Sequence, residues 1–303
     1  MAWSFSNAVG YRGYASIDGI PLLATGGQIS LNQDPLLSSG VWGAGHKNAA
    51  ANIAWAYNYL RLEGNISYEL TKGSVWGKVK TFAFDNRTTA TTIVLRPDGA
   101  NGYNGSAYCS GVSFSCSEGQ LVSGDINFIG DAGSGSTAIT ANGVANSASN
   151  GAGGQSGFYN SIGGADKVIP YWATSVKVNS TAQGDIISWN CSYNSDIQLL
   201  KCCSGNSTAP LGADYVLLGD MSGDGSYTIF TLKGDFVPSS YHGVKENLEF
   251  AIVGAGSMKV PKALVSSGST SIQTGASYVT ADFNFTAIGD GTNAPLSMTT
   301  STT

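Results

Sequence analysis

Hydrophobic and polar residues alternate along most of the chain. In the first half the alternating stretches are residues 53–71, 79–85, 91–96, 107–116 and 121–130. In the second half they are residues 173–179, 185–193, 214–220, 227–236 and 277–287. A period of two with many Val, Ile, Thr and aromatic residues is typical of strands that bury one face. Two tight turns, Glu118-Gly119 and Thr274-Gly275, separate the last two stretches of each half, as expected for hairpins.

Helical patterns are rare in the chain. Residues 245–250 could begin one short helix, and residues 46–56 are compatible with a helix or a strand. The predicted fold is therefore mostly β, as two tandem domains that form a β-sandwich or barrel, each with at most one short helix.

Two pairs of similar segments indicate a duplication. The first pair shares the pattern Ile-Pro-x-x-Ala-Thr, in residues 19–30 and 168–179. The second pair shares Asp, Asn and Phe followed by Ile-Gly-Asp, in residues 124–131 and 281–290. Because the pairs occur in the same order, each half is predicted to open and close alike.

The repeat and the composition divide the chain into five parts. Gly, Ala, Ser and Asn dominate the middle of the chain, which is typical of a flexible linker or of a long loop that lies on a neighbouring subunit. The predicted parts are an N-terminal arm (1–13), a first domain (14–131), the linker or loop (132–165), a second domain (166–291) and a C-terminal tail (292–303).

The low charge content favours a protein that assembles with copies of itself. Charged residues make up 12% of the chain, against roughly 25% in an average protein. A chain that is covered by neighbouring copies needs fewer surface charges for solubility. The net charge of −5 and the scattering of the 15 Lys and Arg residues disfavour a sequence-independent grip on nucleic acid. No segment approaches 18 apolar residues, so no membrane span is expected.

No arrangement of residues predicts catalysis or a cofactor. The two histidines, His46 and His242, have no nucleophile motif around them. The acidic residues mostly flank glycines, as turn residues do. The five cysteines match no zinc-site spacing and are expected to be free thiols. We therefore expect no enzymatic activity.

One segment begins like a calcium-binding EF-hand loop, with Asp220, Ser222 and Asp224 at the first ligand positions. Thr231 stands where such a loop has a bidentate glutamate, and predicted strands flank the segment. A β-hairpin turn is therefore favoured over a calcium site. The tryptophans could also form a platform for a sugar, but most of them lie in alternating stretches, which favours core or subunit contacts.

Residues 110–130 and 267–289 each contain an alternating strand, a tight turn and a second alternating strand. In these hairpins the chain resembles the tail tube proteins of long-tailed bacteriophages, and residues 24–32 and 173–181 resemble the first long strands of that family. The resemblance implies a β-sandwich whose long strands join those of neighbouring subunits into a barrel around the DNA channel. Some members carry two such domains, so that three chains form a pseudo-hexameric ring. The internal repeat is similar to that variant.

The resemblance also implies which residues line the channel. The period of two places Asp125 and Asn127 on one strand face and Asp282 and Asn284 on another. We expect both faces to point into the channel, with the neighbouring phenylalanines in the interior. The alternative is that these residues belong to the exposed polar face of an ordinary sandwich.

Contacts between subunits are expected from two further sets of residues. A long loop reaches the adjacent ring in the family, and its candidates here are Asp34, Leu36, Leu37, Val41, Trp42, His46 and Lys47. The candidates in the N-terminal arm are Trp3 and Phe5.

The predicted function is a structural virion protein that self-assembles into stacked rings of the phage tail tube, the channel for DNA delivery. Its expected partners are copies of itself, other tail proteins, a sheath where the tail has one, and double-stranded DNA that passes without specific binding. Its expected location is the virion tail, after assembly in the host cytoplasm. The alternatives are a tube-end or baseplate ring component of the same fold, and a β-sandwich adhesin or carbohydrate-binding module.

Overall fold

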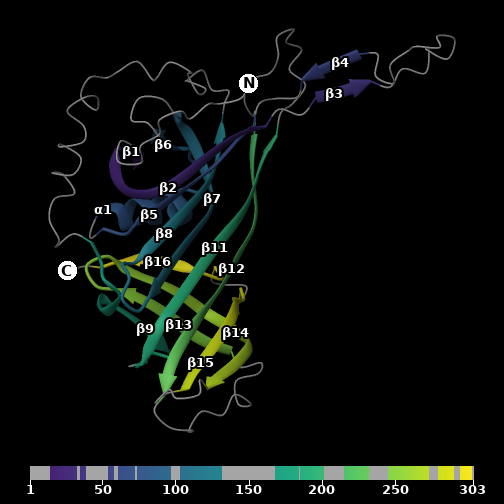
Figure 1. Ribbon diagram of the computed structural model, residues 1–303. Coiled ribbons are helices and arrows are strands. Elements are labelled where there is room, and N and C mark those ends of the chain that lie inside the picture. The colour runs from purple at the N-terminus through teal and green to yellow at the C-terminus, as the bar shows by residue number, and fades with distance from the viewer. Residues whose placement is uncertain are drawn as a thin grey trace.

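The computed structural model describes residues 14–32, 35–38, 54–57, 61–71, 74–96, 103–131, 168–183, 185–200, 215–231, 245–272, 279–289 and 294–301. The prediction of a mostly β fold is confirmed (Figure 1). The strands of the first half are β1 (Tyr14–Ile17), β2 (Ile20–Asn32), β3 (Pro35–Ser38), β4 (Ala54–Tyr57), β5 (Arg61–Glu69), β6 (Thr91–Arg96), β7 (Tyr103–Ser117) and β8 (Ser123–Asp131). Those of the second half are β9 (Thr174–Val178), β10 (Thr181–Gln183), β11 (Ile186–Leu200), β12 (Tyr215–Thr231), β13 (Lys245–Ile252), β14 (Gly256–Ile272), β15 (Val279–Ala287) and β16 (Ser297–Thr300).

Six strands of the first half close into an antiparallel barrel. Their order is β7-β6-β1-β2-β5-β8, and β8 also pairs with β7. Closure gives each strand a partner on both sides over part of its length. The interior is filled by side chains that include Ile66, Phe114, Phe128 and Trp76.

The second half repeats this arrangement. The strand order is β10-β9-β13-β14-β15-β12-β11. The first and last strands of this order, β10 and β11, follow each other directly in the sequence. β10 and β11 together take the place of β2. The first part of β2 pairs with β1 and the rest with β5, just as β10 pairs with β9 and β11 with β12. β16 adds to the start of β14.

Only one of the two similar segment pairs occupies equivalent places. The Asp-Asn-Phe segments lie in β8 and β15, which have the same rank in the two halves. The Ile-Pro segments differ, because residues 20–25 lie in β2 after the first turn, whereas residues 169–173 precede β9 and include the 3-10 turn Tyr171–Ala173. Their similarity is therefore one of sequence alone.

The first hairpin of each half turns through two residues with left-handed backbone. In the first half these are Asp18 (φ 48°) and Gly19 (φ 76°), and in the second half Asn179 (φ 50°) and Ser180 (φ 69°). Two such residues make a type I′ turn, which matches the twist of a hairpin and favours Asn, Asp and Gly. Ser180 is therefore the residue that fits its turn least well.

Replacing Ser180 by Gly is expected to raise the free energy of unfolding by about 0.5–1 kcal/mol, because left-handed backbone is costly for a residue with a Cβ. At the equivalent position, Gly19→Ala is expected to lower it by about 1 kcal/mol. Crowding would not contribute there, since nothing lies within 4 Å of a Cβ at Gly19. Urea unfolding followed by circular dichroism measures both changes. An unchanged free energy of unfolding in Ser180→Gly would contradict backbone strain in this turn.

One predicted strand, residues 79–85, is wrong. These residues belong to α1 (Ser74–Lys80) and to the π-helical turn Thr81–Asp85 that follows it. Buried side chains recur there at helical spacing, and they are Val75, Trp76, Val79, Phe82 and Ala83. The local alternation of residues 79–85 obscured this longer period.

The predicted helix at residues 245–250 is also wrong, because this segment lies in β13. Its side chains Leu248, Phe250 and Ile252 are buried in alternation, as a strand with one face on the core requires. Of the ambiguous segment at residues 46–56, the described part begins the strand β4.

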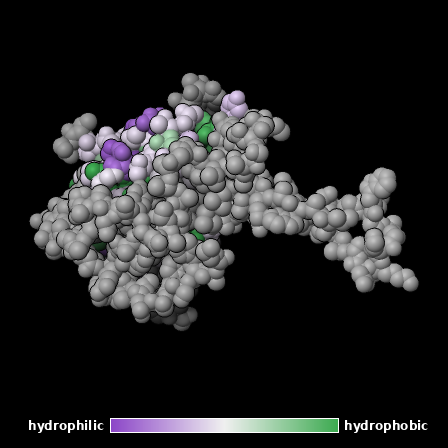
Figure 2. Space-filling model, turned by 90° about the horizontal axis from the view of Figure 1, so that it is seen from above, coloured by the Kyte–Doolittle hydropathy of each residue, from purple (hydrophilic) through white to green (hydrophobic). Residues whose placement is uncertain are grey.

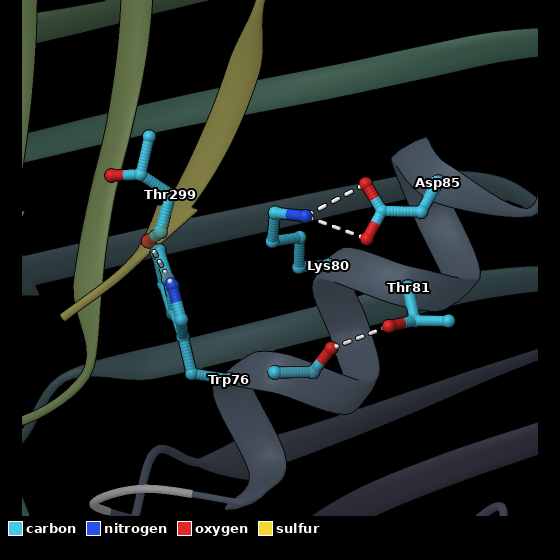
Figure 3. Close-up of polar contacts among 6 residues, drawn as sticks. Trp76, Lys80, Thr81, Asp85 and Thr299 are labelled. Atoms are coloured by element: carbon cyan, nitrogen blue, oxygen red, sulfur yellow. Dashed lines mark hydrogen bonds and ion pairs between the residues drawn. The ribbon is translucent and has the colours of Figure 1, made fainter. Parts of the chain in front are cut away.

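The helix α1 connects the first half to the C-terminal strand. The indole Nε1–H of Trp76 donates a hydrogen bond to the Thr299 carbonyl oxygen at 2.8 Å (Figure 3). Thr81 Oγ1 donates to a backbone carbonyl one turn earlier at 3.0 Å, and Lys80 Nζ lies 2.7 and 2.6 Å from the Asp85 carboxylate oxygens. These contacts hold the helical segment in the shape that presents Trp76 to β16.

Candidate functional site

The two barrels are joined through one pair of antiparallel strands. β7 pairs with β11, from Gly111 opposite Asn194 to Ser117 opposite Ser188. The pairing creates an uninterrupted run of eight strands in the order β2-β5-β8-β7-β11-β12-β15-β14. In Figure 1, β11 and β12 pass from one barrel to the other along this run.

One face of this eight-stranded sheet is polar on all eight strands, although Ile129, opposite Glu63, is buried in a small apolar cluster at one end of it. Cross-strand register places its residues side by side, and none of them is buried. We call this set the polar face: Gln28, Ser30, Glu63, Asn65, Ser67, Ser113, Ser115, Asp125, Asn127, Asn190, Ser192, Asn194, Ser222, Asp224, Ser226, Thr228, Ser269, Asp282 and Asn284. It carries carboxylates but no Lys or Arg. Of the basic residues in these eight strands, Arg61 stands two residues before Glu63 in β5 and opposite Asn32, at one end of this face, and Lys259 and Lys262 stand in β14.

The opposite face of the sheet is apolar and packs into the two barrels. Its buried residues include Ile66, Val112, Phe114, Phe128, Trp189, Cys191, Tyr193, Tyr227, Phe283 and Phe285. Trp189 is 3% exposed, its ring centroid lies 5.3 Å from that of Phe250, and its Nε1–H donates to Thr174 Oγ1 at 3.1 Å. One face therefore belongs to the cores, and the other is available to solvent or a partner.

A carboxylate of the polar face is held between two strands. Asp125 in β8 accepts hydrogen bonds from the hydroxyls of Ser67 at 2.5 Å and Ser113 at 3.2 Å. These serines lie directly opposite Asp125 on the two neighbouring strands. Polar cross-strand pairs of this kind fix the register of strands whose exposed face would otherwise allow slippage.

The same arrangement recurs in the second half. Asp282 in β15 accepts hydrogen bonds from Thr228 Oγ1 at 2.6 Å and from Ser269 Oγ at 3.5 Å, again from the two neighbouring strands. Elsewhere on the same face, Ser192 Oγ donates to the Asp224 carboxylate at 2.9 Å. The polar face thus repeats its hydrogen bonding as well as its strand order.

Two glycines mark a further equivalence between the halves. Gly64 lies opposite Phe128, and Gly225 lies opposite Phe285. A Cβ at either glycine would clash with the phenylalanine ring. The glycine therefore allows the ring to lie across the neighbouring strand inside the barrel.

The structure brings the four predicted channel residues onto one sheet face. Asn127 and Asn284 are exposed, whereas Asp125 and Asp282 are partly buried by their hydrogen-bonding neighbours. That this face lines a channel stays a prediction.

Two other carboxylates of the polar face, Glu63 and Asp224, were not among the predicted channel residues. Glu63 lies opposite Ser30 on β2, and Asp224 lies opposite Ser192 on β11. The alternation of Glu63 with its neighbours is visible in the sequence, but its strand partners are not.

The predicted loop contacts lie partly in a separate hairpin. Leu36 and Leu37 belong to β3, which pairs with β4 in a two-stranded sheet. This hairpin projects beyond the ends of β2 and β5 (Figure 1). The remaining candidates lie outside the described residues, and they are Asp34, Val41, Trp42, His46, Lys47, Trp3 and Phe5.

The hairpin turn predicted at residues 220–226 is wrong, because this segment lies inside the long strand β12. Residues 220, 222 and 224 are every second residue of the strand, and all three are exposed. At about 3.3 Å per residue, the outer two are about 13 Å apart and cannot surround one ion. Within the described part of the chain, no group of three His, Cys, Asp or Glu residues could hold a metal.

The described cysteines are buried free thiols at positions 109, 116 and 191. Burial raises the pKa of the Cys109 thiol to about 12, and it also raises the pKa of Cys191. Both thiols are therefore protonated at neutral pH and are poor nucleophiles.

The free energy of unfolding is expected to fall as pH rises from about 9 to about 12. The Cys109 thiol has an ordinary pKa of 9.0 but a pKa of about 12 in the fold, so ionisation favours the unfolded chain in this range. Below pH 9 this thiol contributes no pH dependence. Urea unfolding at several pH values measures the slope, and Cys109→Ala is expected to make it shallower. Equal slopes in both proteins would contradict the assignment.

The surface formed by the described residues carries both polar and apolar side chains. Seen from above, its visible part is largely purple to white, with a few green residues (Figure 2). Its exposed large apolar side chains are Trp172, Leu200, Tyr215, Leu217, Leu218 and Val253. None of the helices in this part of the chain is long and apolar enough to cross a membrane.

Comparisons find partial likenesses to several solved structures, including the following two. The chain is similar to one from the anti-feeding prophage cap, which terminates the AFP tube, with a TM-score of 0.33 and 11% identity over 44% of this chain and 91% of that chain. It is also similar to a chain from the virion of the native gene transfer agent particle, with a TM-score of 0.30 and 12% identity over 42% of this chain and 96% of that chain. No protein-family model and no curated protein matches the sequence.

Proposed function

We propose that this protein is a structural, non-enzymatic virion component that self-assembles into rings, which stack into a phage tail tube. The proposal rests on the eight-stranded sheet, which has one apolar buried face, one polar acidic face and an open strand edge at each end. In this proposal the polar face lines the channel for DNA.

The open edges favour self-assembly. Among the described residues, no strand pairs with the second edge of residues 25–32 in β2, nor with that of residues 265–272 in β14. Long unpaired edges are a hazard unless another strand covers them. Pairing between copies would satisfy both edges and, repeated around an axis, would close a wide barrel.

The chemistry of the polar face suits a channel through which DNA slides. Double-stranded DNA carries one negative charge per about 1.7 Å of its axis, and proteins hold it chiefly with Lys and Arg. The residues of the polar face offer carboxylates, hydroxyls and amides, and Arg61 stands only at the end of this face, opposite Asn32. The face would therefore repel phosphates weakly and would not retain the DNA.

Negative-stain microscopy of the purified protein tests the proposal. Hollow tubes made of stacked rings are the expected result, and cryo-electron microscopy would then count the chains in each ring, expected to be three. Single closed rings would favour a tube-end or baseplate component instead. A protein that stays monomeric at high concentration and binds glycans would contradict the tube and favour an adhesin.

A further inference from the structure

We propose that copies of this chain join through β14 of one copy and β2 of the next, antiparallel and in the register of the β7–β11 junction. The inference rests on the proposed function, because it specifies the contact that closes the ring. In this contact the open β14 edge of one copy pairs with the open β2 edge of the next. Each chain therefore carries both of the edges that the contact needs.

The strand order identifies the partners. Four strands of the first half, β2-β5-β8-β7, are followed in the sheet by four strands of the second half, β11-β12-β15-β14. The two sets have the same internal order, so β7 corresponds to β14, and β11 corresponds to β2. The pair that joins the halves inside the chain therefore has counterparts in the two strands that lie at the open edges.

β14 also matches β7 in detail. Each strand has a bulge against the strand that follows it, just after Cys109 in β7 and just after Val265 in β14. Beyond the bulge, Ser113 and Ser269 each lie opposite the aspartate that is held between two hydroxyls. Ser269 is therefore the counterpart of Ser113.

β2 matches β11 in the same way, and both have a bulge early in the strand. Beyond it, Ile29 in β2 and Cys191 in β11 each lie opposite the glycine that is covered by a phenylalanine ring. The next residues along the strands, Ser30 and Ser192, are therefore counterparts.

These counterparts transfer the internal register to the joint between copies. Inside the chain, Ser113 lies opposite Ser192. Between copies, Ser269 would therefore lie opposite Ser30. Antiparallel pairing then sets the other pairs, which are Ile272 with Gly27, Ser271 with Gln28, Thr270 with Ile29, Gly268 with Leu31, and Ser267 with Asn32.

The residue types along the two edges agree with this register. Every second pair would be polar and uncharged, namely Ser271 with Gln28, Ser269 with Ser30, and Ser267 with Asn32. The polar face would therefore continue from copy to copy without a charge at the seam. A slip of one residue would set polar positions against positions of the apolar face along the whole joint.

Disulfide cross-linking tests the register. Tubes are assembled from a mixture of two full-length variants, Ser30→Cys and Ser269→Cys, then oxidised and analysed on a non-reducing gel. Directly opposite residues have Cα atoms about 4.5–5.5 Å apart, within reach of a disulfide. Dimers are expected in the mixture, whereas each variant alone is expected to stay monomeric. Dimers from one variant alone would show like edges pairing and would overturn the proposal.

A second pair and an off-register pair sharpen the test. Gln28→Cys with Ser271→Cys is expected to cross-link, whereas Ser30→Cys with Ser271→Cys is expected not to, because diagonal partners lie about 7–8 Å apart. Tubes that cross-link at neither in-register pair, or better at the off-register pair, would overturn the joint and leave the tube standing. Failure of the unmodified protein to form tubes would instead overturn the proposed function.

Discussion

Tubes that carry Asn127→Lys and Asn284→Lys are expected to bind short double-stranded DNA, whereas tubes of the unmodified protein are expected not to bind it. Both asparagines are exposed on the polar face, so the change adds a ring of ammonium groups to a set of residues that contains carboxylates and no Lys or Arg. With about 6–10 phosphate contacts, affinity would fall on the order of 10³–10⁵-fold between 50 and 200 mM salt. Co-sedimentation of a labelled duplex with tubes at the two salt concentrations measures the effect.

The matched control places the same two lysines off the polar face. Asn86 and Asn247 are exposed and lie after the π-helical turn and in β13. In Asn86→Lys with Asn247→Lys tubes, any bound duplex would lie outside and be digested by nuclease, whereas duplex in the channel of the first variant would be protected. Equal protection in both variants would contradict the assignment of the polar face to the channel.

The strand faces could be predicted from the sequence because they depend on local alternation. The segments that became β8 and β15 show a period of two, which in β8 ends at Ile129, and the Asp and Asn residues lie on the face opposite to that of the buried Phe residues. The turn Glu118-Gly119 was also visible, and the structure places it between β7 and β8, with Gly119 at φ 75°. Such features need no knowledge of which strand lies next to which.

The long strand β12 shows where local patterns fail. Its glycines suggested a turn, but Gly223 and Gly225 lie inside the strand, where a Cβ would meet Leu296 in one case and Phe285 in the other. Those neighbours are about 60–70 residues away in the chain. Glycine is required there by a contact that only the folded sheet creates.

The junction between the halves could not be predicted for a related reason. Alternation identifies β7 and β11 as strands but says nothing about their partners, which are about 75 residues apart in the chain. Helix α1 was missed similarly, since it packs against β1, β2 and β16 and the π-helical turn that follows it packs against β7, and these contacts form only in the folded chain. The open edges, on which the proposed assembly depends, follow from topology and not from any motif.

Replacing Trp189 by Ala is expected to cause the largest loss of stability among single substitutions at the junction. Trp189 lies opposite Cys116 of β7, fills the second barrel against Phe250 and is almost completely buried. Its removal leaves a cavity and deprives the Thr174 hydroxyl of its donor, which together cost roughly 3–5 kcal/mol. Urea unfolding monitored by circular dichroism measures the loss.

The chain offers a matched control in Trp172, which is 74% exposed. Trp172→Ala is expected to change the free energy of unfolding by less than about 0.5 kcal/mol, as for most surface substitutions. Trp189→Phe, which keeps an aromatic ring but not the indole N–H, is expected to fall between the two. Equal losses at the two tryptophans would show that the junction between the barrels does not depend on this side chain. A large loss at Trp189 together with intact tubes would show that joints between copies can hold a weakened junction in place.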